Sequence, residues 1–309
     1  MSFLWAMLGN PQVVNALWVG TTVAAGSGAI GVFVVIRGQA FAGHVLTDVG
    51  AAGAAGSLLI GANVWYGFVS FGLLAGSGIE ILGGRARNRD VVTGIILSFA
   101  MGLEALLLFL VNRYTTNVGS TMLVLFGSLF AAAPSLTPLV SGLGLGMAAL
   151  LLLIYRPLLL CSVNPEIAQS RGVRVRLVGI LFMLLLVLAV ENGAMVIGAL
   201  LSTALLIGPA AIAIRLTART GWAVFLAAWI GVAVTWLGIL LAYASYYWPP
   251  YGRGWPVSFF ISSLLFVVYL GLRLGPTVAA GWTATTTWAG GAWGKNADPT
   301  SKRPSGKGA

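Results

Sequence analysis

Residues 175–216 read VRLVGILFMLLLVLAVENGAMVIGALLSTALLIGPAAIAIRL, two long apolar runs that meet near the polar pair Glu191 and Asn192. A bilayer's hydrocarbon core is about 30 Å thick, and about 20 helical residues at about 1.5 Å each cross it once. Each run is therefore long enough for one membrane span. The whole chain has a similar character, because 59% of its 309 residues are hydrophobic and 8% are charged. Soluble domains carry about 25% charged residues.

Similar apolar runs along the chain predict an all-α integral membrane protein, a polytopic bundle of about nine transmembrane helices. The short apolar segment at residues 120–133 is interpreted as an outer half-helix or a re-entrant piece. Residues 1–274 form the predicted membrane domain. Residues 275–309 lack apolar periodicity and are predicted to be a disordered tail. The predicted spans are Val13–Ile36, His44–Gly61, Val64–Leu82, Val91–Val111, Pro134–Tyr155, Val175–Glu191, Ala194–Ile214, Trp222–Tyr247 and Val257–Leu274.

The basic residues predict the orientation of the chain in the cell membrane. If the N-terminus is outside, the cytoplasmic segments and the C-terminal tail contain all of the 17 Lys and Arg residues except Arg113 and Arg253. This distribution follows the positive-inside rule. The net charge of +10 does not indicate nucleic-acid binding, because the basic residues lie between apolar runs and form no basic stripe. A single histidine and a single cysteine exclude a His-Glu-x-x-His zinc hydrolase and a cysteine-based metal cluster.

Three segments together resemble the permease subunits of zinc, manganese and iron ABC importers. In Arg37–Asp48 (RGQAFAGHVLTD), His44 precedes Asp48, whereas the family usually has the aspartate first and the histidine four residues later. Asn164–Gly172 (NPEIAQSRG) resembles the loop by which these permeases contact their ATPase. Residues 198–211 (GALLSTALLIGPAA) are similar to the family's helix of small residues and proline.

This resemblance implies the compact fold of type II importers and a role as a transport subunit, not an enzyme. The implied partners are an ABC ATP-binding subunit, an extracytoplasmic solute-binding protein and a second copy of the chain in a homodimer. The chain has no Gly-x-x-x-x-Gly-Lys-Ser/Thr phosphate loop, so ATP is expected to bind the partner subunit. The only metal expected is the transported divalent ion, and no cofactor is expected to be bound permanently.

The predicted metal pathway contains His44, Asp48 and Glu104. Residues i and i+4 of a helix share one face, so His44 and Asp48 can present an imidazole and a carboxylate to one ion. Zinc accepts both ligand types and manganese prefers oxygen, so the pair does not select the metal. Two other interpretations remain open: a His44–Asp48 hydrogen bond without metal, and an interhelical hydrogen bond for Glu104.

Glu191 and Asn192 are interpreted either as an outer gate or as an interfacial cap. Gly50 and Gly53 belong to a glycine strip that permits close helix approach. Pro209 removes one helical hydrogen bond and can kink its helix. These last three residues are expected to serve packing first and a hinge second.

The ATPase-coupling loop is predicted at Asn164, Pro165, Glu166, Ala168, Arg171 and Gly172. Asn164 is a good N-cap, Pro165 fits the first helical position, Glu166 complements the positive helix end and Gly172 can end the turn. The alternative is a surface helix that packs only on its own bundle.

Two alternative functions remain open. In a proton-coupled secondary transporter, Glu104, Asp48 and His44 would form a proton relay. In a type II ABC permease for a metal chelate such as haem or a siderophore, the partners would be the same and the cargo would differ.

Overall fold

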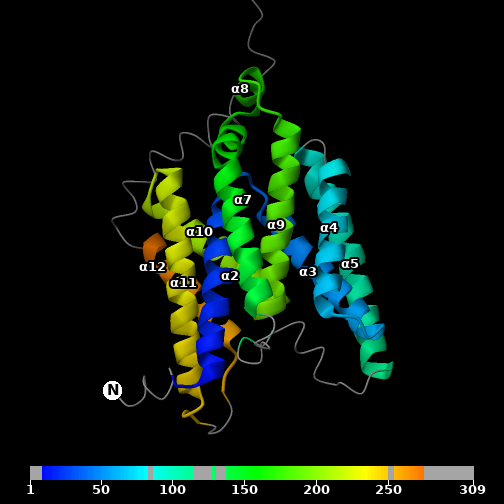
Figure 1. Cartoon of the computed structure of the whole chain (residues 1–309), viewed down its shortest axis with the longest axis vertical. Coiled ribbons are helices and arrows are strands. Elements are labelled where there is room, and N and C mark those ends of the chain that lie inside the picture. The colour runs from blue at the N-terminus through cyan, green and yellow to red at the C-terminus, as the bar shows by residue number, and fades with distance from the viewer. Residues whose placement is uncertain are drawn as a thin grey trace, which may run out of the picture.

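The structure is a computed structural model that describes residues 9–82, 86–114, 127, 129, 137–249 and 254–274. Across these residues it is helical, and no strand occurs in them. Figure 1 shows long helices that run side by side, with the short helix α8 projecting beyond one end of the bundle. The helices are α2 (Pro11–Ile36), α3 (Ala40–Leu59), α4 (Val64–Leu82), α5 (Ala86–Tyr114), α7 (Thr137–Val163), α8 (Pro165–Ser170), α9 (Val175–Ile197), α10 (Ala199–Leu216), α11 (Thr220–Ser245) and α12 (Val257–Leu274).

Each of the nine predicted spans overlaps a helix, and Val64–Leu82 and Val257–Leu274 match to the residue. Seven helices in the described part of the chain are long and apolar enough to cross a membrane. The two predicted spans outside that count are α3 and α10. Helix α3 is rich in glycine and alanine and carries His44 and Asp48, and α10 contributes only the shorter apolar stretch Leu201–Leu216. The all-α membrane fold is confirmed.

The boundary between α9 and α10 differs from the prediction. The sequence placed a break at Asn192 and Gly193, but α9 continues to Ile197 and the chain turns at Gly198. Gly198 has a φ of 99°, a conformation that glycine adopts without a steric penalty. Glu191 and Asn192 therefore lie inside a helix. The predicted segment 120–133, apart from Gly127 and Leu129, and the predicted tail 275–309 lie outside the described residues.

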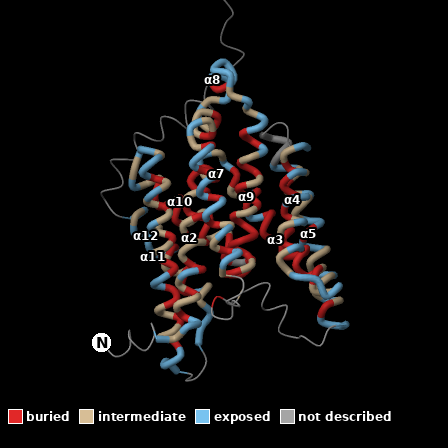
Figure 2. Tube along the Cα trace, viewed as in Figure 1, coloured by how far each residue is buried: buried red, intermediate tan, exposed pale blue. Residues whose placement is uncertain are grey.

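Buried residues concentrate in the central helices, as Figure 2 shows. In α9, 72% of the most apolar window is buried, whereas the value is 11% in α5. The outer face of α5 exposes large apolar side chains such as Ile95, Phe99 and Phe109, as expected of a helix in contact with lipid. Helices α2, α3, α9 and α10 thus form the interior, where functional groups are shielded from lipid.

Helices α3 and α9 run in the same direction through this interior. Near the α8 end, the guanidinium of Arg37, just before α3, lies 4.9 Å from the ring centre of Phe182 on α9. Farther from α8, Gly50 of α3 meets Glu191 of α9. Helix α3 also packs against α4, α5 and α10, so residues on its different faces meet different partners.

Candidate functional site

His44 and Asp48 lie one turn apart on α3, as predicted. His44 Nε2 is 3.8 Å from Asp48 Oδ2, and the side chains are 51% and 18% exposed. The two side chains are therefore placed so that one cation could contact both without any rearrangement of the helix. An imidazole nitrogen and a carboxylate oxygen together suit a borderline divalent ion.

A pair of threonine hydroxyl groups, absent from the predicted site, connects to His44. Thr203 of α10 places its Oγ1 3.5 Å from His44 Nδ1 and 3.2 Å from the Oγ1 of Thr47. Thr47 is buried and donates to the Gly43 carbonyl over 3.1 Å. A metal-binding histidine is commonly oriented through its second ring nitrogen, and Thr203 stands at that nitrogen. The only sequence signal for this contact is the presence of polar residues inside apolar spans.

Glu104 of α5 is half-buried, and its carboxylate is close enough to Asp48 for the two charges to interact. Like charges repel, and a cation between them would relieve that repulsion. Among the described residues, however, no group of three or more His, Cys, Asp or Glu side chains is close enough to hold a metal ion. In this conformation the acidic and imidazole groups thus offer at most a two-ligand site, with water and hydroxyls available for the remaining positions.

Glu191 and Asn192 lie apart from this pair, on α9, and are 1% and 2% exposed. The structure therefore does not place them at an exposed helix end. The Glu191 carboxylate lies against Gly50 of α3 and Gly72 of α4, where an added Cβ would overlap it. The polar atoms of both side chains are buried and have no hydrogen-bond partner among the described residues. Burial of such groups is costly in a membrane protein.

Gly53 and Pro209 both lie against a neighbouring helix. An added Cβ at Gly53 would overlap the Gly67 carbonyl of α4, so these two helices approach closely because both positions lack a side chain. Pro209 lies within α10. Its ring faces α11 at Gly231, with 3.6 Å between Pro209 Cγ and an added Cβ there.

The predicted local structure of the Asn164–Gly172 loop is confirmed. Asn164 Oδ1 accepts hydrogen bonds from the backbone N–H groups of Glu166 (3.0 Å) and Ile167 (3.1 Å). Pro165 is the first residue of α8, Arg171 follows its last turn, and Gly172 has a φ of 80°.

Helix α8 is anchored to its own bundle but leaves much of its surface open. Ala168 is fully buried, while Ile167 is 47% exposed. A helix of six residues is too short to be stable alone. At the end of the bundle (Figure 1), its remaining surface can contact another protein.

Comparison with known proteins gives matches over most of the chain. The sequence model of the ABC 3 transport family matches residues 10–271. The chain is 31% identical over 232 residues to the manganese import system permease protein ScaB of Streptococcus parasanguinis, covering 74% of this chain and 81% of that protein. It is 30% identical over 220 residues to the high-affinity zinc uptake system membrane protein ZnuB of Haemophilus influenzae, covering 68% and 82%. The solved structure of PsaBC from Streptococcus pneumoniae in complex with Fab superposes with a TM-score of 0.77 at 24% identity, covering 90% of this chain and 97% of that chain.

Proposed function

Because this chain belongs to the ABC 3 transport family, we propose that it is the permease subunit of an ATP-driven importer of a divalent transition metal ion. The names of the relatives support manganese or zinc as the cargo, and a chelated iron transport system membrane protein of Yersinia pestis, 29% identical over 238 residues, adds iron. The observation that carries the proposal is the His44–Asp48 pair, a nitrogen and an oxygen ligand 3.8 Å apart on a central helix.

The transported ion is expected to contact His44 and Asp48 and to be drawn toward them by the Glu104 carboxylate. A site with so few protein ligands suits transport, because an ion must leave a pathway as readily as it enters. Glu191 and Asn192 are proposed as the outer gate of this pathway. Gly50, Gly53 and Pro209 are proposed as positions where the helices pack closely and hinge.

Helix α8 is the proposed contact with a separate ATP-binding subunit. Its exposed surface at one end of the bundle and the capped loop Asn164–Gly172 support this role.

The proposed orientation places α8 and the C-terminus in the cytoplasm and the N-terminus outside. An extracytoplasmic metal-binding protein would then deliver the ion at the opposite end. Two copies of the chain and two ATPases would form the working importer.

Reconstitution tests the proposal. The permease, its ATP-binding subunit and its binding protein are placed in proteoliposomes, and uptake of manganese, zinc and iron is measured. We expect uptake that requires ATP and survives collapse of the proton gradient, and that is lost in Asp48→Asn. Uptake that follows the proton gradient without ATP would instead support a secondary transporter. ATP-dependent uptake of a metal chelate, with none of the free ions, would support a chelate importer.

A further inference from the structure

The Glu191 carboxylate occupies a place where an acid is energetically costly. Both of its oxygens are buried with no hydrogen-bond partner among the described residues, and the residue is 1% exposed. An isolated carboxylate in such a place costs several kcal/mol when ionised. An apolar side chain would fill the same space without that cost, so the acid is not explained by the packing of this conformation.

Glu191 is enclosed where three helices meet. Its carboxylate lies between Gly50 of α3 and Gly72 of α4, and a Cβ added at either position would overlap it. The enclosure therefore depends on α3 and α4 standing close to α9. A movement of these two helices away from α9 would open the space around the carboxylate.

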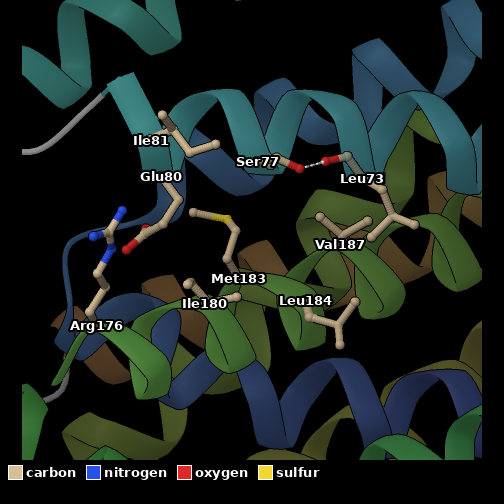
Figure 3. A pocket seen from close by; sticks show the side chains of 10 residues that line it. Leu73, Ser77, Glu80, Ile81, Arg176, Ile180, Met183, Leu184 and Val187 are labelled. Carbon is tan, nitrogen blue, oxygen red and sulfur yellow. Dashed lines mark hydrogen bonds between the residues drawn. The ribbon is translucent and has the colours of Figure 1, made fainter. Parts of the chain in front are cut away.

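The contact between α4 and α9 combines glycines on α4 with a neighbouring cavity, which leaves room for such a movement. Toward the α8 end, Gly76 of α4 meets Met183 and Val187 of α9. Beside this contact lies a cavity of about 490 Å³. Figure 3 shows side chains of both helices around it, with Glu80 and Arg176 together at one end. On the α4 side this contact is made by the glycines Gly72 and Gly76, and the adjacent volume is not filled by protein.

The position of Glu191 relative to the His44–Asp48 pair determines which of the two an incoming ion meets first. Helices α3 and α9 run in parallel, and Gly50 follows Asp48 on α3 away from the α8 end. Residues two apart on a helix point in directions about 160° apart, so Asp48 and Gly50 lie on nearly opposite faces of α3. Helix α3 therefore separates the two carboxylates. With α8 in the cytoplasm, an ion that moves inward meets Glu191 first.

We propose that Glu191 is the first cation-binding residue of the pathway, sealed in this conformation and exposed when α3 and α4 separate from α9. An incoming divalent metal ion binds the exposed carboxylate, and the same displacement of α3 lets it pass around that helix to His44 and Asp48. Burial without a partner disfavours the ionised form of Glu191, whereas exposure to water or to a cation favours it, so ion binding and opening of the site are linked. This inference rests on the proposed import function.

Uptake by the reconstituted importer tests the role of the charge. Glu191→Gln keeps the shape and removes the charge, and Asp90→Asn, at an exposed position of α5, is the matched control. We expect Glu191→Gln to lower manganese uptake on the order of tenfold at limiting ion concentration, and Asp90→Asn to leave it unchanged. Uptake that is absent from the unaltered importer would contradict the proposed function itself. Normal uptake by Glu191→Gln would contradict only the role of Glu191.

Chemical labelling of the unaltered protein supplies a readout that does not depend on a variant. A water-soluble carbodiimide with an amine nucleophile labels exposed carboxylates, and mass spectrometry locates the label. We expect Glu191 to be unlabelled in the resting importer, labelled during ATP hydrolysis, and protected during hydrolysis by saturating Mn²⁺. Labelling at rest, or labelling during hydrolysis that Mn²⁺ leaves unchanged, would overturn the proposal.

Discussion

The Glu191 carboxylate fills the space that a side chain at Gly72 would need. In Gly72→Ala, the added methyl group forces α4 away from α9 or displaces the carboxylate, and overpacking of this kind costs about 1–3 kcal/mol. We expect a lower unfolding temperature for the detergent-solubilised protein. Gly94→Ala on α5 is the control, because its added Cβ meets no described atom within 4 Å. Equal losses in the two variants would contradict the close packing at Gly72.

Thr203 is expected to position His44 for metal binding. Its hydroxyl lies 3.5 Å from His44 Nδ1, and loss of one hydrogen bond of about 1 kcal/mol corresponds to about a fivefold change in affinity. We expect Thr203→Val to raise the KM for metal uptake by that factor with kcat unchanged, and Thr203→Ser to restore it. A Ser variant as impaired as the Val variant would show that the methyl group matters and the hydroxyl does not.

The spans and the His44–Asp48 pair were predictable because their signals are local. Long apolar runs identify the helices, and a spacing of four residues places both side chains on one face of α3. The cap of α8 was equally local, since Asn164, Pro165 and Gly172 each have a preferred position at a helix end. The interpretation of α8 as a docking element came from resemblance and stays a prediction.

The break between α9 and α10 and the surroundings of His44 were not predictable from local signals. A polar pair inside an apolar run suggests an interface, so the sequence placed the break near Glu191. That residue is instead buried because glycines on two other helices leave room for it. Thr203 is 159 residues from His44, and only the packing of α10 against α3 brings the two together. In both cases tertiary contacts determine the outcome.

Helix α8 is expected to need its asparagine cap in order to couple to an ATPase. Asn164→Ala removes the acceptor of two backbone hydrogen bonds and destabilises the helix by about 1 kcal/mol. We expect metal-stimulated ATP hydrolysis in the reconstituted complex to fall, and Asn164→Asp, which also caps well, to retain it. The amount of ATPase subunit that co-purifies serves as a separate measure of docking. Full stimulation in Asn164→Ala would contradict a coupling role that depends on the cap.

Arg215 joins α10 to α12 through a single aromatic residue in two distinct ways. Its Nη2 donates to the Tyr269 hydroxyl over 2.9 Å, and its guanidinium carbon lies 4.5 Å from the ring centre. Tyr269→Phe removes only the hydrogen bond, whereas Tyr269→Leu also removes the cation–π contact, each interaction being worth about 1 kcal/mol. Unfolding temperatures should therefore fall in the order Tyr, Phe, Leu. In an Arg215→Ala background all three should coincide, because the cation that both interactions require is gone. A difference that persists there would assign the effect to the packing of the ring instead.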